Sequence, residues 1–214
     1  SSSVATPAVE LRGAVAALLV RCTLQGFSFT DGAESAGLLA QQSRAFLYEC
    51  SVTGGLGDHL AGFGTAAPGV RVIDGFFFAE GSTLKGGAGT SMGAPPGCLM
   101  AIDGGPGLWL ESGDPQAVLY DTLTLGGTDG GLCSNAGVPL LISSGTLETV
   151  PGDSAALDAT SPVLDDGPVS VTITGTPGDS AVLLVGLPGS LPYSPPFKGA
   201  WTVGAGALIL FLGP

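Results

Sequence analysis

Cysteine is the residue type in this sequence with the clearest capacity for chemistry. The chain has four cysteines and one histidine, His59, and no two cysteines form a Cys-x-x-Cys pair. These residues lack the spacing of a zinc site. An even number of cysteines in an acidic chain with few lysines favours disulfide bonds and an oxidising compartment, with four buried thiols as the alternative. The residues concerned are Cys22, Cys50, Cys98 and Cys133.

The carboxylates give little support for an enzyme. A glycoside hydrolase needs two carboxyl groups at a suitable separation, but no Asp-x-Asp pair occurs in the segments that we expect to form strands. A polysaccharide lyase needs a base beside acidic groups, and the candidates are Arg71 with Asp74 and Lys85 with Glu80. A single histidine supports no Ser-His-Asp triad, and no phosphate-binding loop occurs. We therefore assign no catalytic and no cofactor-binding residue.

Calcium and sugars are the ligands that the remaining residues could bind. Turns rich in Asp and Gly suit a hard cation, and Asp103, Asp114 and Asp129 lie in such turns. None of these turns matches the nonapeptide calcium repeat, so we expect unliganded turns, with no metal ligand and no cofactor. The aromatic side chains that could stack on sugar rings are Tyr48, Trp109, Tyr120 and Trp201.

The composition excludes several classes of protein. Among 214 residues there are 37 glycines and 16 prolines, and 18 acidic residues face 6 basic ones, for a net charge of −12. Glycine and proline disfavour a helical bundle, while a mean hydropathy of +0.47 disfavours charged disorder. The excess of anions argues against a nucleic-acid partner. No apolar run is long enough for a membrane-spanning helix, and we expect a secreted protein whose signal peptide has been removed before Ser1.

A degenerate repeat organises most of the chain. Short apolar segments end at Gly26, Gly54, Gly86 and Gly126, with offsets of 28, 32 and 40 residues. The positions before each glycine agree in residue type across the four segments. Two residues before the glycine lie Leu24, Val52, Leu84 and Thr124. Four residues before it lie Cys22, Cys50, Ser82 and Thr122, and seven residues before it lie Leu19, Leu47, Ala79 and Leu119. Short strands that recur in this way favour a parallel β-solenoid, whose coils stack to bury a common core. An antiparallel sandwich is the alternative.

Two glycine-rich phrases carry a family resemblance. They are Ser82–Gly89 (STLKGGAG) and Thr122–Gly130 (TLTLGGTDG), together with the cysteine-bearing loop Gly93–Gly107. From residue 14 to about 148, the chain resembles the right-handed parallel β-helix repeat proteins that environmental bacteria secrete. The resemblance implies an N-terminal extension over 1–13 and a right-handed parallel β-helix over 14–150.

The repeat columns also predict contacts between coils. Cys22 and Cys50 share a column, and coils about 4.8 Å apart are within the Cα separation that a disulfide tolerates. We therefore expect a Cys22–Cys50 bridge, which leaves Cys98 to pair with Cys133, and a ladder of stacked free thiols is the alternative. The same register stacks Arg21 on Glu49 as an exposed ion pair.

The pattern changes after residue 150. Residues 151–167 read as a linker, and 168–214 hold four segments that predict a small antiparallel sheet of about four strands, at 169–175, 181–186, 200–203 and 207–212. The first of them alternates with period two, as a half-buried strand does. This part resembles the C-terminal β-domain that follows the β-helix in the same secreted proteins. The expected fold is therefore all-β, a right-handed parallel β-helix followed by a small antiparallel sheet or sandwich domain. Its last apolar strand is an open edge that could pair with another chain. This assembly strand comprises Ala207, Leu208, Ile209, Leu210, Phe211 and Leu212.

These features predict a secreted, non-enzymatic structural or surface protein. We expect a homo-oligomer or polymer, assembled into an extracellular fibre or layer by β-strand addition. The alternative without assembly is that the C-terminal sheet packs on the end of the β-helix as its cap. Two other functions stay open: a polysaccharide lyase or glycoside hydrolase of the β-helix type, and an adhesion module that binds a polysaccharide.

Overall fold

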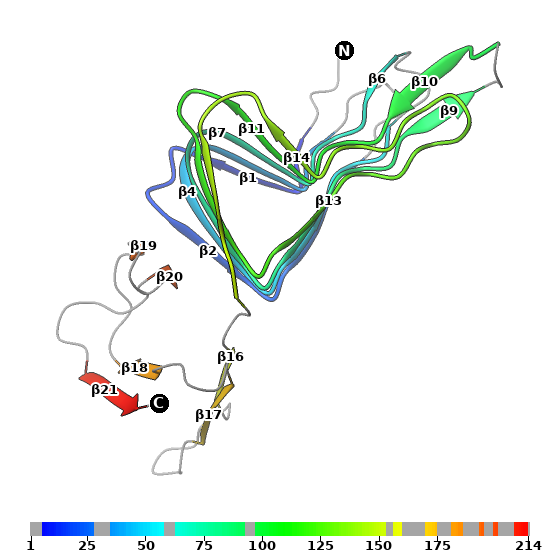
Figure 1. Ribbon diagram of the computed structural model, residues 1–214. Coiled ribbons are helices and arrows are strands. Elements are labelled where there is room, and N and C mark those ends of the chain that lie inside the picture. The colour runs from blue at the N-terminus through cyan, green and yellow to red at the C-terminus, as the bar shows by residue number, and fades with distance from the viewer. Residues whose placement is uncertain are drawn as a thin grey trace. The chain divides into compact units, whose positions relative to one another are not determined.

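A computed structural model of the chain describes residues 6–27, 35–57, 63–92, 97–152, 156–159, 170–174, 181–185, 193–194, 199–200 and 208–213. The chain divides into two compact units, Ser1–Val150 and Pro151–Pro214. The first unit is a parallel β-solenoid of about four turns (Figure 1). Within these described ranges, no helix is long and apolar enough to cross a membrane.

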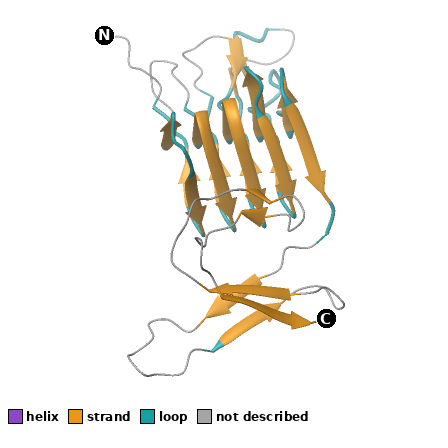
Figure 2. Ribbon diagram, turned by 90° about the vertical axis from the view of Figure 1, so that its left-hand side faces the viewer, coloured by secondary structure: helices purple, strands orange, loops and turns teal. Residues whose placement is uncertain are grey.

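Each full coil of the solenoid runs along three faces. Strands of neighbouring coils lie side by side (Figure 2), and every pairing between coils on these faces is parallel. One sheet carries the first two faces and a four-stranded sheet the third. The strands are β1 (Val9–Arg12), β2 (Ala17–Val20), β3 (Thr23–Gln25), β4 (Leu38–Tyr48), β5 (Ser51–Thr53), β7 (Val70–Glu80), β8 (Thr83–Lys85), β11 (Leu108–Ser112), β12 (Gln116–Tyr120), β13 (Leu123–Leu125), β14 (Leu140–Ile142) and β15 (Thr146–Val150).

The strand register confirms the repeat columns. Leu19 pairs with Leu47, Leu47 with Ala79 and Ala79 with Leu119. On the third face, the column of Leu24 continues in the same way through the three later coils. One difference lies at the start of the chain, because β1 falls inside the segment that was expected to be an extension. Its alternation of apolar and charged residues fits a half-buried strand on β4.

The interior of the solenoid is filled by alternate residues of each strand. Leu38, Val70 and Leu108 form one column of the first face, and each is at most 1% exposed. On the second face, Phe77 and its column neighbours complete this core. Parallel coils place equal positions above one another, so core residues recur along each column even where their sizes differ, as in the column of Ala45, Phe77 and Ala117.

The corners between faces depend on residues with positive φ. At the corner before the third face, Arg21, Glu49, Gly81 and Asp121 have φ between 44° and 55°. The left-handed conformation reverses the chain sharply, and it is uncommon outside glycine. Three coils therefore carry a charged side chain at this corner, outside the core.

Glycine-rich excursions leave the coils between the third face and the next first face. Two of them form a three-stranded sheet that we call the fin (Figure 1), with β6 (Phe63–Thr65), β9 (Thr90–Met92) and β10 (Met100–Asp103). At its base, the N–H of Gly87 donates to Ala67, that of Gly105 to Gly87 and that of Gly127 to Gly105. A Cβ on Gly127 would lie 1.7 Å from the carbonyl oxygen of Gly87. We call these glycine-bearing backbone segments at the base of the fin the neck. They approach one another so closely that only glycine fits.

In the residues of the second unit that the structure describes, three antiparallel strand pairs occur. They are β16 (Ala156–Ala159) with β17 (Val171–Thr174), β18 (Ala181–Val185) with β21 (Leu208–Gly213), and β19 (Tyr193–Ser194) with β20 (Gly199–Ala200). The segments expected to be strands at 169–175 and 181–186 contain β17 and β18, and the segment at 207–212 overlaps β21. The expected strand at 200–203 falls, apart from Ala200, outside the described residues.

Candidate functional site

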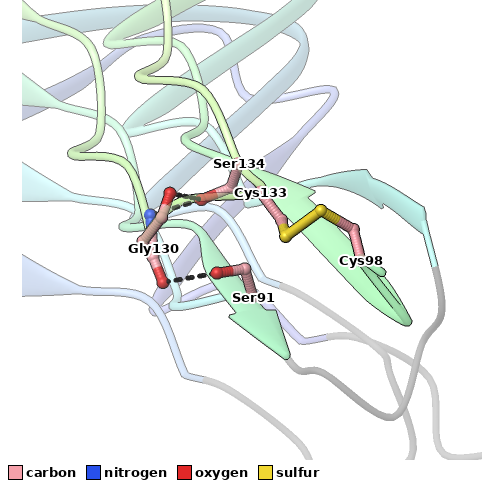
Figure 3. The surroundings of a disulfide bond; sticks show 6 residues. Ser91, Cys98, Gly130, Cys133 and Ser134 are labelled. Carbon is pink, nitrogen blue, oxygen red and sulfur yellow. Dashed lines mark hydrogen bonds between the residues drawn. A yellow bond between two sulfur atoms is a disulfide. The ribbon is translucent and has the colours of Figure 1, made fainter. Parts of the chain in front are cut away.

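Cys98 and Cys133 form a disulfide bond, as the cysteine pairing predicted (Figure 3). Their sulfur atoms are 2.05 Å apart and their Cα atoms 5.8 Å apart. Nearby, the Ser91 hydroxyl donates to the carbonyl oxygen of Gly130 at 2.9 Å, and the Gly130 N–H donates to the Ser134 hydroxyl at 2.6 Å. These bonds attach the 130–134 loop to the fin.

The expected Cys22–Cys50 bridge is wrong, because both residues are free cysteines. They do occupy neighbouring positions in consecutive coils. Each thiol donates instead to the carbonyl oxygen two residues earlier, that of Val20 or Tyr48, at 3.3 Å. Parallel, in-register side chains point the same way, whereas a disulfide needs Cβ atoms that approach to about 3.8 Å. The alternative of stacked free thiols is the one that the structure bears out.

Arg21 and Glu49 form the ion pair that the columns predicted. The Arg21 Nε lies 2.7 Å from Glu49 Oε2, and both side chains are well exposed. An exposed pair of this kind contributes about 0–1 kcal/mol to stability. The pair is informative because it shows that Arg21 and Glu49 occupy equivalent positions in consecutive coils.

Arg71 pairs with Glu111 of the next coil and not with Asp74, the partner considered from the sequence. The guanidinium Nε and Nη2 both donate to the Glu111 carboxylate, with 2.8 Å for Nη2 to Oε1. The same guanidinium lies 5.0 Å from the centre of the Trp109 ring. Asp74 lies at a left-handed corner of its own, with φ of 50°.

A cavity of about 310 Å³ opens beside this Arg–Glu–Trp group. We call it the Arg71 pocket. One wall is the outer surface of the first face, and the other is the chain that returns from the fin to the first face. The Trp109 indole is held in place because its Nε1–H donates to the Ser143 hydroxyl at 3.1 Å. The lining residues are Thr65, Ala66, Ala67, Pro68, Arg71, Pro106, Trp109 and Leu141.

Glu80 is a carboxylate whose protonation is strongly perturbed by its surroundings. In register it lies between Tyr48 and Tyr120, which confirms that these tyrosines share a column. Burial, and then the charges of Asp121 and Glu49, raise its pKa to about 7. A carboxylic acid with such a pKa can hold or donate a proton near neutrality. Lys85, considered as its partner, lies on the third face in a different sheet.

The turns considered for calcium have other roles or face solvent. Asp103 Oδ1 accepts hydrogen bonds from the backbone N–H and the Nδ2 of Asn135, at 2.6 and 3.1 Å. Asp114 and Asp129 are exposed. Among the residues that the structure describes, no group of three or more His, Cys, Asp or Glu side chains could hold a metal ion.

Some sequence candidates fall beyond the described residues. His59 and Trp201 lie there, as does part of the Gly93–Gly107 loop. Of the assembly strand, Leu208 to Leu212 belong to β21, which pairs along one edge with β18 of the same chain. Strands have two edges, so this pairing leaves the expectation of assembly untested.

No family model matches this chain, and searches of curated proteins and of solved structures find no similar protein. Of the resemblance noted in the sequence, the structure supports the architecture, which is a parallel β-solenoid of about four turns. Any function has to be argued from the geometry above.

Proposed function

We propose that this protein is a secreted, non-enzymatic structural protein that assembles with copies of itself by β-strand addition. The observation that carries the proposal is the outer edge of β13. In the four-stranded sheet of the third face, β13 is a terminal strand, paired with β8 on one side. Its Leu123 and Leu125 are 55% and 38% exposed. An exposed, apolar edge strand is a template for another strand.

The backbone of β13 is suited to such an addition. The Leu123 N–H donates to the carbonyl of Ser82, and the Leu125 carbonyl accepts from Gly86, so both residues direct their backbone groups toward β8. In a parallel strand successive residues alternate in direction, so the backbone groups of Thr124 are directed away from β8. A strand from another copy would supply partners for them, and the assembly strand in β21 is our candidate donor.

Secretion is supported by the disulfide between Cys98 and Cys133, since such bonds persist in oxidising compartments. A rigid coil stack with charged corners also suits an extracellular fibre or layer.

Assembly can be tested with two substitutions at one residue of β13. Thr124→Pro removes an outward N–H without breaking a bond to β8, whereas Thr124→Val keeps that N–H and the shape of the side chain. We expect wild type and Thr124→Val to form fibres or layers in negative-stain microscopy as concentration rises, and Thr124→Pro to stay monomeric. Sedimentation that shows wild-type monomers at every concentration would contradict the proposal.

One observation favours the hydrolase alternative. Glu80 combines a pKa of about 7 with two neighbouring carboxylates, Glu49 and Asp121, and a raised acid beside an ionised carboxylate is what glycoside hydrolysis requires. Release of reducing ends from neutral or acidic polysaccharides by wild type, and its loss in Glu80→Gln, would establish that function instead.

A further inference from the structure

The Arg71 pocket combines apolar walls with one charged side chain, Arg71, whose ion-pair partner Glu111 lies beside the pocket and is not part of its lining. Its volume of about 310 Å³ falls at the lower end of the range for small-molecule sites, about 300–1,000 Å³. Trp109, Pro68, Pro106 and Leu141 supply flat or apolar surface. A ligand that fills it must offer an apolar face and also polar groups at its rim.

The charged pair is neutral as a unit. The Glu111 carboxylate binds the Nε and Nη2 of Arg71, which leaves the Nη1 amino group of Arg71, a residue that lines the pocket, outside these two bonds. The Glu111 oxygens retain lone pairs, because a carboxylate accepts at several positions. A donor and an acceptor thus lie side by side with no net charge.

Vicinal hydroxyl groups match this arrangement. Each hydroxyl both donates and accepts, so two neighbouring hydroxyls can bond to a guanidinium and a carboxylate at once. The C–H face of a pyranose ring is apolar and suits an aromatic or proline surface. An anionic ligand is disfavoured, because Glu111 already neutralises Arg71 and the chain carries a net charge of −12.

We propose that the Arg71 pocket binds a pyranose ring of a neutral glycan. The ring lies against Trp109 and the two prolines, and its hydroxyls bond to Arg71 and Glu111. The guanidinium is held by Glu111 and by the indole at 5.0 Å, and the indole by Ser143. This site is therefore formed before the ligand arrives, which reduces the entropic cost of binding. The inference does not depend on self-assembly.

The chain offers a matched control in Arg44. Its guanidinium also lies over aromatic rings, 5.7 Å from the centre of Phe46 and 5.6 Å from that of Phe76, but it does not line the pocket. Arg71→Met and Arg44→Met therefore remove the same kind of stacked cation, one at the proposed site and one away from it.

Saturation-transfer NMR on the full chain tests the proposal with soluble oligomers of glucose, mannose and xylose, and with galacturonate oligomers as the charged comparison. We expect binding of at least one neutral oligomer, unchanged in Arg44→Met and weakened about tenfold or more in Arg71→Met and Trp109→Ala. Trp109→Phe keeps an aromatic face and should retain most of the affinity, with circular dichroism to confirm folding.

Three results would overturn the proposal. One is that no neutral oligomer binds to the wild type. Another is that Arg71→Met and Trp109→Ala, still folded, bind as the wild type does, or that Arg44→Met loses binding equally. The third is that galacturonate binds more tightly than every neutral oligomer.

Discussion

The sulfur of Cys50 lies 3.4 Å from the backbone nitrogen of Cys22 in the neighbouring coil and accepts its hydrogen bond. The Ser82 hydroxyl does the same for the nitrogen of Cys50, at 3.0 Å. Each member of this column also donates to the carbonyl two residues earlier, as Ser82 does to Glu80 and Thr122 to Tyr120, both at 2.9 Å. The column thus needs a small side chain with one polar γ atom after each left-handed corner.

This relationship predicts two free thiols and one disulfide. Cys22 is partly exposed, whereas Cys50 is 3% exposed and burial raises the pKa of its thiol. Because alkylation requires an accessible thiolate, we expect Cys22 to react first and Cys50 to react only slowly in the native protein. Mass spectrometry of a non-reduced digest checks this: a linked Cys98–Cys133 peptide is expected, and a linked Cys22–Cys50 peptide would contradict it.

The same column predicts the effect of replacing Cys50. Cys50→Ser supplies a γ oxygen as Ser82 does, so we expect a free energy of unfolding within about 1 kcal/mol of wild type. Cys50→Ala leaves the Cys22 N–H without this acceptor and should cost about 1–3 kcal/mol. Urea unfolding of both variants measures the difference. Equal stability of the two would show that the γ atom does not support the corner.

Glu80 predicts a loss of stability as pH rises. Its folded pKa of about 7 lies above the ordinary value of 4.5, so its contribution is fully present below pH 4.5 and is lost as pH rises through 7. Because the side chain is partly solvated, we discount the effect to about 1–2 kcal/mol. Urea unfolding between pH 4.5 and 8 measures it.

Asp121→Asn tests the cause of this pH dependence. Asparagine tolerates the left-handed conformation of residue 121 and removes one of the charges that raise the pKa of Glu80. We expect a smaller loss of stability between pH 4.5 and 8 than in wild type. Glu148→Gln, at an exposed glutamate, serves as the charge-matched control and should keep the full loss. An unchanged pH profile in Asp121→Asn would rule out the assigned cause.

Two glycines predict very different costs for the same substitution. A Cβ on Gly87 would lie 1.8 Å from the Gly55 carbonyl oxygen, so Gly87→Ala must displace backbone in the neck. We expect a loss on the order of 4 kcal/mol or more. Gly13 has φ of +61° and open space around it, so Gly13→Ala should cost only the strain of about 1–2 kcal/mol. Thermal melts of the two variants compare them, and similar melting temperatures would contradict the close packing of the neck.

The second and third faces were predictable from the repeat, whereas β1 of the first face was not. Leu19 and Leu47 could be aligned because a fixed distance joins them to Gly26 and Gly54 in each coil. β1 has only four residues, and its alternation becomes meaningful only once β4 is placed beside it. The Cys22–Cys50 bridge was preferred to the free-thiol alternative because Cα spacing alone does not say where the sulfur atoms point.

The Arg71 pocket shows what the repeat could still have revealed. The glycine anchors Gly86 and Gly126 are 40 residues apart, and the residue 40 positions after Arg71 is Glu111. This offset would have suggested the ion pair. It would not have placed Trp109 beside Arg71, because the register of β11 on β7 shifts between Leu110 and Ser112. The cavity also depends on the path of the chain between the fin and the first face, and the repeat columns do not describe that path.

Because of the glycine neck, the geometry of a coil does not depend on the number of residues in its repeat. Chain that leaves through the neck returns to the same column position, whether the anchors are 28, 32 or 40 residues apart. Insertions into these excursions therefore change neither the register nor the core. Most of the variation in repeat length therefore lies along one margin of the solenoid, and new recognition surfaces can arise along that margin without a new fold.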